Sequence, residues 1–171
     1  MGGVWQRPSG SQEVQAVEPT PKGTYGRGLP KVLLPIFKVM MGLSVATFGL
    51  YGKRGRVMGR PLLRLTTVGV RSGKRRRTVL GWFPGDDNTW TLVGSGAGSA
   101  RHPAWCINLV RHPDQVWVEA GGRKLKVTPR LLQGAEREEA WKSVVSLSPG
   151  YGNYQKATDR EIPVIRLRAE E

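Results

Sequence analysis

The sequence predicts a mostly antiparallel α+β domain, most simply a small β-barrel with five or six strands and three or four helices. Three observations lead to this prediction. Strand-like segments recur from about residue 60 onward, tight turns separate several of them, and strands do not alternate with helices as a doubly wound sheet requires. A chain of 171 residues, of which 39% are hydrophobic, fits one domain with a sizeable core.

The first thirty residues predict a disordered leader. Residues 1–30 are rich in Gly, Pro, Ser and Gln and show no apolar periodicity, so they have little to bury. No continuous apolar run follows a basic start, which argues against a secretory signal peptide.

The next segment, residues 31–56, predicts an amphipathic or apolar helix followed by a basic linker. Residues 31–51 are mainly apolar but contain Lys38, and a membrane-spanning helix needs about 20 mainly apolar residues, so the stretch is borderline. The cations that follow are Lys53, Arg54 and Arg56. One interpretation is a helix packed on the barrel, and the other is a helix lying on an anionic membrane surface. We expect partial packing on the core, with peripheral membrane contact left open.

Residues 57–171 form the predicted barrel domain. The expected strands are residues 62–68, 78–83, 90–93, 116–119, 124–127 and 162–167, and the expected helices are residues 103–110 and 136–147. Gly121 and Gly122 predict a tight hairpin, as do residues 85–88. Pro163 predicts either an edge position or an irregular start for the last strand.

Charge and cysteine content limit the classes of function. The chain has 27 Lys and Arg against 13 Asp and Glu, a formal charge of +14, which favours nucleic acid, anionic lipid or a phosphorylated cofactor as partner. A single cysteine, Cys106, excludes an internal disulfide and a cysteine zinc site and fits a reducing, intracellular setting. With only His102 and His112, we expect no metal site.

The basic run of residues 71–77 is the strongest candidate binding site. It places five cations and a glycine between two predicted strands. Arg forms paired, charge-assisted bonds to phosphate and carboxylate, and a strand-to-strand turn holds such charges on a rigid frame. A solvated turn in a basic protein is the alternative.

Three weaker candidates follow. The glycine-rich loop of residues 94–99 lets a ligand approach the backbone before a helix begins, although a plain loop explains it equally well. Trp105 and Asn108 share one helical face; without other information, Trp105 is a core residue and Asn108 a solvated or capping amide. Tyr151 and Tyr154, one helical turn apart, either line a pocket as hydrogen-bond or proton donors or fill the core.

Taken together, these segments resemble the deazaflavin-dependent nitroreductase and quinone reductase family, actinobacterial proteins that use coenzyme F420. The resemblance runs from about Leu62 to Leu167. It rests on the order and spacing of short motifs: Leu65-Thr66-Thr67, Gly69-Val70-Arg71-Ser72-Gly73, Trp82-Phe83, the glycine loop, His102-Pro103-Ala104-Trp105, Asn108-Leu109, Pro149-Gly150-Tyr151, Tyr154-Gln155 and Thr158-Asp159-Arg160-Glu161-Ile162-Pro163.

The resemblance implies a split β-barrel of the flavin-reductase type that holds coenzyme F420 in a groove. The positions that match the grip on the coenzyme's phosphate and tail are Arg71, Ser72 and Arg76. Those that match the strand along the ligand are Arg77, Thr78, Val79, Leu80 and Gly81. The loop under the deazaflavin ring matches Val93, Gly94, Ser95 and Gly96, and the helix start that completes the groove matches Ala104, Trp105, Cys106, Ile107 and Asn108. The catalytic candidates are Ser95, Tyr151 and Tyr154.

Two positions depart from the family's pattern. Gly96 stands where the family often has a lysine, so one anchoring cation is missing, and Lys74, Arg75 and Arg77 are candidates to replace it. The aromatic residue common in the second strand aligns with either Gly81 or Trp82. The missing lysine leaves FMN open as a less favoured cofactor.

The expected function is hydride transfer from reduced coenzyme F420 to a lipophilic acceptor such as a quinone, with nitroaromatics as side substrates. The alternative from another class is a non-catalytic binder of nucleic acid or anionic membrane. We expect a cytoplasmic protein, with peripheral contact at the inner face of the cell membrane through residues 31–56 as a further expectation.

Overall fold

The computed structural model describes residues 20–28, 30–51, 55–57, 59–85 and 88–170. Most of the leader predicted for residues 1–30 therefore lies outside the described residues. Its last part, residues 20–28, contacts the barrel: the amide of Thr24 donates to the Asp159 carboxylate at 2.9 Å, and the hydroxyl of Thr158 donates to the Tyr25 carbonyl at 2.9 Å. Gly26 also pairs with Thr158 in an isolated antiparallel bridge.

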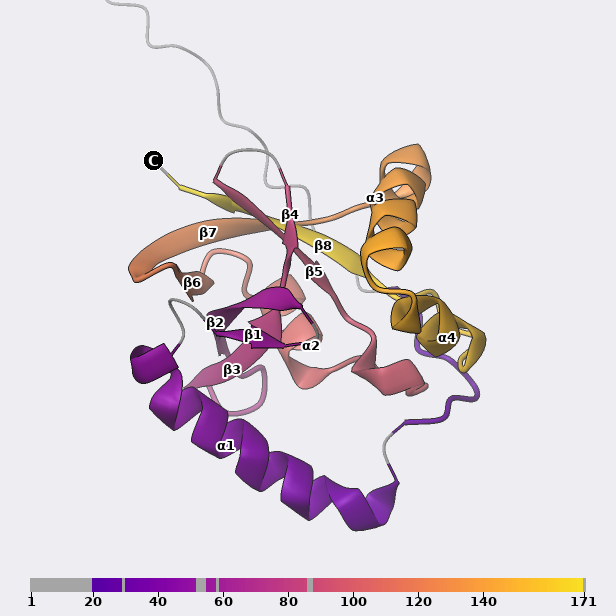
Figure 1. The fold of residues 1–171 in the computed structure, drawn as a ribbon, viewed down its shortest axis with the longest axis horizontal. Helices are drawn as coiled ribbons and strands as arrows, with labels where there is room; N and C mark the ends of the chain where they lie inside the picture. Colours follow the sequence, from indigo (N-terminus) through magenta and orange to yellow (C-terminus); the bar gives the residue numbers. More distant parts are fainter. Residues whose placement is uncertain (1–19, 29, 52–54, 58, 86–87, 171) are drawn as a thin grey trace, which may run out of the picture.

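The described strands form one antiparallel sheet, as the sequence predicts (Figure 1). Its strands are β1 (Arg56–Val57), β2 (Arg60–Val68), β3 (Arg75–Gly81), β4 (Phe83–Pro84), β5 (Thr89–Val93), β6 (Trp117–Ala120), β7 (Arg123–Leu131) and β8 (Val164–Ala169). The order runs β1-β2-β6-β7-β8-β5-β4, and β3 pairs with β2. Because β3 and β4 lie at different ends of this ladder but only Trp82 separates them in the chain, the sheet must curl back on itself. This curling produces the split barrel.

The turns follow the sequence predictions. Gly121 and Gly122 connect β6 to β7 with φ values of +58° and +81°, the left-handed pair that a two-residue hairpin of type I′ requires. Pro163 directly precedes β8, which pairs with β5 on one side and β7 on the other. The edge position predicted for this strand is therefore wrong, and the strand begins at Val164, directly after the proline.

The helices lie outside the barrel. They are α1 (Leu34–Tyr51), α2 (Ala104–Arg111), α3 (Gly134–Leu147) and α4 (Gly150–Lys156), with short 3-10 turns η1 (Lys31–Leu33) and η2 (Gly96–Gly98). In Figure 1, α1 crosses the foot of the molecule beside β3, while α3 and α4 lie together on the opposite side. Gly150 and Gly152 are poor helix formers, which explains why the pattern did not define α4 as an element.

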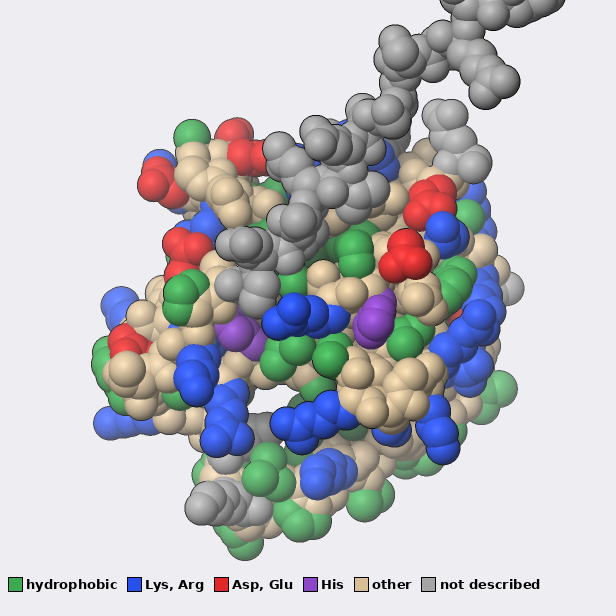
Figure 2. All heavy atoms as spheres, turned by 180° about the vertical axis from the view of Figure 1, so that it is seen from behind, with side chains coloured by type: hydrophobic (Ala, Val, Ile, Leu, Met, Phe, Trp, Pro, Cys, Tyr) green, Lys and Arg blue, Asp and Glu red, His purple; other side chains and the backbone are tan. Residues whose placement is uncertain are grey.

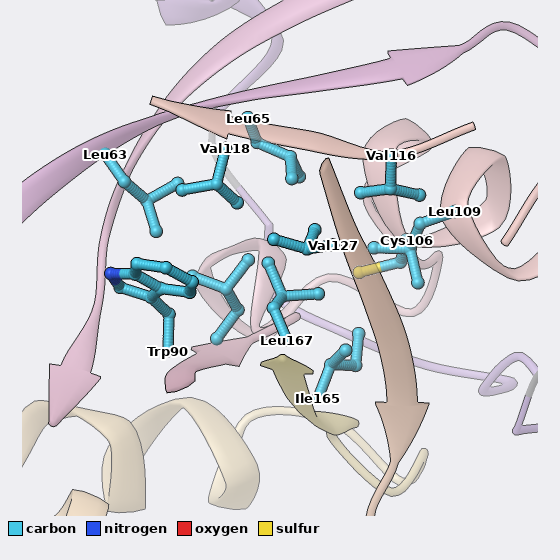
Figure 3. Packing of buried hydrophobic residues seen from close by; sticks show 11 residues of the cluster. Leu63, Leu65, Trp90, Cys106, Leu109, Val116, Val118, Val127, Ile165 and Leu167 are labelled. Carbon is cyan, nitrogen blue, oxygen red and sulfur yellow. The ribbon is translucent and has the colours of Figure 1, made fainter. Parts of the chain in front are cut away.

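The core fills the inside of the curled sheet (Figure 3). Side chains from β2, β5, β6, β7, β8 and α2 point toward one another there, and most are fully buried. The members of this cluster are Leu63, Leu65, Trp90, Leu92, Cys106, Leu109, Val116, Val118, Val127, Ile165 and Leu167. Every second residue of β2 in its central part belongs to this cluster, which is the alternation that a strand with one buried face produces.

Helix α1 packs on the barrel through its C-terminal half only. Phe48 is 3% exposed and forms a small cluster with Leu62 and Val79, against which Met41 and Val45 pack. Residues 34–40, which precede these contacts, are exposed and mainly apolar, with Lys38 among them. The exposed large side chains of α1 are Leu34, Ile36, Phe37, Val39, Met40, Leu43 and Leu50. Of the helices in the described parts of the chain, none has the length and apolar character needed to cross a membrane.

Leu92→Ala tests the core. Leu92 lies on β5 with no exposed surface, so its truncation removes buried apolar contacts and leaves a cavity. We expect the free energy of unfolding to fall by about 2–5 kcal/mol, measured by urea denaturation. The matched control is Leu147→Ala on α3, which is 64% exposed and should change the stability by less than about 0.5 kcal/mol. Equal effects of the two changes would contradict this assignment of the core.

Candidate functional site

A groove of about 620 Å³ lies between the turn that joins β2 to β3 and the first half of α2. Two segments of the chain that are about thirty residues apart form its walls. The lining residues are Thr67, Gly69, Val70, Arg71, Ser72, Arg76, Arg77, Thr78, Ala104, Trp105, Ile107 and Asn108. Three of these are arginines and none is acidic, so the groove is suited to an anionic ligand. We call it the arginine groove.

Backbone hydrogen bonds make the β2–β3 turn rigid. The Gly69 carbonyl accepts from the amides of Ser72 and Gly73 at 3.1 and 2.8 Å, and the Gly69 amide donates to the Lys74 carbonyl at 2.9 Å. A Cβ at Gly69 would lie 2.8 Å from the Ser72 hydroxyl oxygen, so a larger residue there would have to displace that hydroxyl. Arg76 in turn donates to the Ser72 hydroxyl at 3.3 Å.

Asn108 joins this turn to α2. Its side chain is 8% exposed; the carboxamide oxygen accepts from the Val70 amide at 3.3 Å, and the NH₂ group donates to the Thr67 hydroxyl at 3.2 Å. The interpretation of Asn108 as a solvated or capping amide is therefore wrong. A buried polar side chain with both ends hydrogen-bonded fixes the width of the groove between turn and helix.

The cations of the basic run separate into two groups. Arg71, Arg76 and Arg77 line the groove, their side chains are exposed, and within the described residues none of them forms an ion pair with a carboxylate. Arg75 instead lies over the Trp117 ring, 4.6 Å from its centroid. Figure 2 shows an opening between α1 at the lower edge of the molecule and the barrel, with Lys and Arg side chains along its border.

A buried arginine, Arg160, organises the glycine loop. It is 2% exposed, and its guanidinium donates to the carbonyls of Gly94, Ser95 and Ser99 at 2.7–3.0 Å. Burial lowers the pKa of Arg160, and the three carbonyl dipoles stabilise its charge in place of a carboxylate. It also contacts the Nδ1 atom of His102 at 3.2 Å. Because a guanidinium only donates, this Nδ1 atom accepts and the proton of the neutral ring lies on Nε2, 2.8 Å from the Thr20 carbonyl.

The charged residues on either side of Arg160, which are Asp159 and Glu161, bond to segments outside this turn. The Asp159 carboxylate accepts hydrogen bonds from the Thr24 hydroxyl and from the backbone amides of Thr24 and Tyr25. The Thr24 hydroxyl is the largest cause that lowers the pKa of Asp159, and the two amides lower it further. Glu161 pairs with Arg137 on α3 at 3.3 Å. Each charged residue of the motif therefore ties a different segment to the barrel.

Tyr151 and Tyr154 lie together on α4. Their ring centroids are 5.7 Å apart in an edge-to-face arrangement, and Tyr151 makes a similar contact with Phe83 at 5.5 Å. Arg60, at the start of β2, donates from Nη1 to the Tyr151 phenol oxygen at 2.5 Å. Burial raises the pKa of the Tyr151 phenol, and the Arg60 charge opposes this rise. Arg60 could not be recognised as a partner of Tyr151 from the sequence, because the two residues are 91 positions apart.

The loop and the tyrosine helix pack against each other, apart from the arginine groove. A Cβ at Gly98 in η2 would lie 3.1 Å from the Tyr154 carbonyl oxygen. The residues that line the arginine groove do not include Ser95, Gly96, Tyr151 or Tyr154. The loop leads into α2, whose first residues Ala104 and Trp105 do line the groove, so one continuous segment borders both places.

Several candidate side chains face the interior instead. Val79 packs under α1, Leu80 packs against the main core, and Cys106 is 4% exposed within that core. Burial raises the pKa of the Cys106 thiol well above its ordinary value, which disfavours the reactive thiolate. At Gly81, a Cβ would meet the Arg60 guanidinium at 3.2 Å. None of these four positions is among the residues that line the arginine groove.

Comparison with known proteins identifies the family. The family model described as F420H(2)-dependent quinone reductase matches residues 46–168. The chain belongs to this family. The recognition from sequence motifs is thus confirmed, and with it an oxidoreductase that uses reduced coenzyme F420.

Relatives and solved structures agree with this assignment. An F420H(2)-dependent quinone reductase of Mycobacterium tuberculosis is 33% identical over 124 residues, which cover 68% of this chain and 82% of the relative. A second relative from that species, described as a putative F420H(2)-dependent quinone reductase, is 32% identical over 63% of this chain and 89% of its own. The solved F420-H2 dependent reductase FDR-A is 38% identical over 64% of this chain and 95% of its own, with a TM-score of 0.57. A structure described as a domain-swapped dimer is 33% identical over 78% of this chain and 99% of its own, with a TM-score of 0.58.

The residues present fit the coenzyme. Its phosphodiester and glutamate tail are anionic, and the arginine groove offers three guanidinium groups and no carboxylate among its lining residues. Trp105 and Ile107 add an apolar wall beside these cations. The donor set therefore suits a ligand with an anionic tail and a flat ring system.

Arg160→Met tests the role of the buried arginine. The change keeps an unbranched apolar stem but leaves three loop carbonyls without their donor. We expect a loss of roughly 2–4 kcal/mol in the free energy of unfolding, since each unpaired buried group costs about 1–3 kcal/mol. Hydrogen exchange at the Gly98 and Ser99 amides should also accelerate. Arg168→Met, which removes an exposed charge from β8, is the control and should change neither quantity.

Proposed function

We propose that this protein transfers a hydride from reduced coenzyme F420 to a lipophilic, quinone-like acceptor, with nitroaromatics as side substrates. The observation that carries the proposal is the arginine groove, where three cations without carboxylate partners in the described residues lie beside Trp105 and Ile107. Family membership supplies the coenzyme. The M. tuberculosis relative named as a quinone reductase supports the class of acceptor.

In this proposal Arg71, Ser72 and Arg76 hold the phosphate and the tail of the coenzyme. Arg76 and Ser72 are already hydrogen-bonded to each other, so their positions are set before a ligand arrives. Arg77 and Thr78 continue the same wall along β3, and the backbone of Val79, Leu80 and Gly81 extends it toward the tyrosines. When bound, the coenzyme supplies a hydride from its ring carbon.

In this proposal the glycine loop and α2 form the surface on which the deazaflavin ring of the coenzyme lies. Gly94 and Gly96 have no side chains, Arg160 fixes the loop carbonyls, and the Ser95 hydroxyl is available to bond near the ring. Val93 precedes the loop, and Ala104 to Asn108 close the groove from the other side. The missing family lysine at Gly96 is offset by Arg77, which lines the groove.

In this proposal the phenols of Tyr151 and Tyr154 supply the proton. Reduction of a quinone needs a proton in addition to the hydride, and a phenol whose oxygen already accepts a hydrogen bond keeps its own hydrogen available to donate. Tyr151 meets this condition because Arg60 donates to its oxygen. Tyr154, 5.7 Å from it between centroids, orients the acceptor or relays the proton.

A lipophilic acceptor resides in the membrane, and α1 offers a surface for contact with it. The helix exposes Ile36, Val39 and Leu43, each more than 60% exposed, and carries Lys38 among them. We therefore include peripheral contact with the inner face of the cell membrane in the proposal.

The decisive experiment is fluorescence titration of the purified protein with coenzyme F420 and with FMN, followed by a screen of menaquinone-like acceptors with the reduced coenzyme. Tight binding of F420 that survives added DNA, together with quinone reduction, supports the proposal. Tighter binding of FMN than of F420 would show that the protein is an FMN-dependent reductase instead. Steeply salt-dependent DNA binding without coenzyme binding would favour the basic binder instead.

Arg76→Gln tests the anion site. Loss of one charge-assisted bond should weaken F420 binding about 10- to 100-fold, because such a bond contributes about 1.5–3 kcal/mol. Arg75→Gln is the matched control: it removes the same charge from the neighbouring position, but its guanidinium lies over Trp117. Equal weakening by both changes would show a general charge effect and contradict a specific site.

Tyr151→Phe and Tyr154→Phe test the proton donor. We expect turnover to fall on the order of 100-fold for Tyr151→Phe, as removal of a general acid does, and by less for Tyr154→Phe. Coenzyme affinity, measured by fluorescence, should hardly change in either. Tyr25→Phe, at a residue 59% exposed in the leader, is the control. Wild-type turnover in both α4 variants would remove the phenols from the mechanism.

A further inference from the structure

Arg60 has an unusual position for a charged residue at the start of a strand. Its guanidinium carbon lies 5.0 Å from the centroid of the Phe83 ring and 4.9 Å from that of the Tyr151 ring. From there it also donates the 2.5 Å hydrogen bond to the Tyr151 phenol oxygen. Two aromatic contacts and one hydrogen bond hold the cation in a single orientation.

Gly81 makes room for this arrangement. A side chain on Gly81 would begin 3.2 Å from Nη1 and 3.3 Å from the guanidinium carbon of Arg60, which is tighter than ordinary packing. The antiparallel register pairs Leu62 with Gly81, so the end of β3 lies beside the start of β2, where Arg60 lies. The absence of a side chain at position 81 therefore allows the guanidinium to reach Tyr151 on α4.

We propose that Arg60 is a positioning residue for proton transfer, which holds the Tyr151 phenol with its hydrogen directed to the acceptor and stabilises the phenolate left after the transfer. The inference rests on the proposed function and selects Tyr151, rather than Tyr154, as the proton donor. The geometry carries it: the phenol oxygen accepts from Arg60, so its own hydrogen points elsewhere.

Reduction of the quinone requires one hydride and one proton. The acceptor quinone receives a hydride, with its electron pair, from the reduced coenzyme and a proton from the Tyr151 hydroxyl, and these convert two carbonyls into the two hydroxyls of a quinol. The O–H bond of Tyr151 breaks, and its electron pair stays on the phenolate oxygen beside the Arg60 cation. A proton from solvent then restores the phenol. Without Arg60 the phenolate would form in a half-buried, apolar environment, which disfavours a charge.

The charges around Tyr151 give the direction of the effect. Burial is the largest influence and raises the phenol pKa, the Arg60 charge and hydrogen bond lower it, and Tyr154 raises it slightly. Removal of the Arg60 charge therefore leaves two influences that both raise the pKa. Replacement by Lys keeps the charge but loses the planar stacking between the two rings.

The test uses the coenzyme-free full-length protein first. The phenol of Tyr151 is titrated by NMR with labelled tyrosine, and the signal that disappears in Tyr151→Phe identifies it. Arg60→Met should raise the phenol pKa, because the charge and the hydrogen bond that lower it are lost, while Arg60→Lys should recover most of the difference. Arg56→Met is the control, since Arg56 bonds to the Gly59 carbonyl and not to Tyr151.

The same variants are then assayed with a quinone and the reduced coenzyme. We expect Arg60→Met to lower kcat about 10- to 100-fold, less than the roughly 100- to 1,000-fold loss caused by removal of a donor that touches the reacting atoms, because Arg60 acts through Tyr151. The Kd for the coenzyme should stay within twofold of wild type. An unchanged phenol pKa or an unchanged kcat in Arg60→Met overturns the inference. If Arg60→Met does not fold, as judged by circular dichroism, Arg60→Gln decides, because it removes the charge but keeps a polar side chain: a fall in kcat with a raised phenol pKa supports the inference, and wild-type values overturn it. Failure of wild-type protein to bind the coenzyme would instead overturn the proposed function, and the phenol titration separates the two outcomes.

Discussion

The pairing of β2 with its neighbours is the constraint on which the rest of the structure depends. Its first residue, Arg60, reaches Tyr151; its central residues Leu63 and Leu65 fill the core; and near its end Thr67 holds the amide of Asn108. Slippage of the β2–β3 ladder by one residue would turn these side chains to the opposite face. The register of β2 therefore determines both the packing of the core and the geometry of the site.

Electrostatics separates two kinds of arginine in this basic protein. Arg71, Arg76 and Arg77 remain exposed along a groove, where a ligand's charge can meet them. Arg160 is buried and stabilised by backbone carbonyls, so its role is to hold the loop in shape. The first group is arranged for binding, and the second keeps the binding surface fixed before a ligand arrives.

Local patterns predicted much of the fold. Alternation in β2, the Gly121–Gly122 hairpin and the helices α2 and α3 depend on short segments, and the structure has them. Helix α4 was not defined by the pattern, because its glycines weaken the helix signal while packing against α3 and η2 stabilises it. The basic run of residues 71–77 could be recognised from the sequence, because the charge of Lys and Arg follows from the residue type and not from a contact in the fold.

Contacts between distant segments could not be predicted in this way. The carbonyl partners of Arg160, the two hydrogen bonds of Asn108 and the contact of Arg60 with Tyr151 each join residues between 38 and 91 positions apart. Spacing within one element carries no information on such pairs. For the same reason the sequence did not reveal that Val79 and Cys106 turn their side chains away from the groove.

The attachment of residues 20–28 has a mechanical consequence for α1. The chain before the helix is bonded to Asp159 and Thr158, and the chain after it enters the sheet as β1, so both approaches to the helix are anchored. A helix held at both ends can tilt or shift sideways, but neither of its ends can separate from the barrel alone. Met41 and Val45 on this helix line a pocket with Arg76 and Arg77, which are two of the three arginines of the groove, so a tilt of the helix would move the apolar surface beside these two cations.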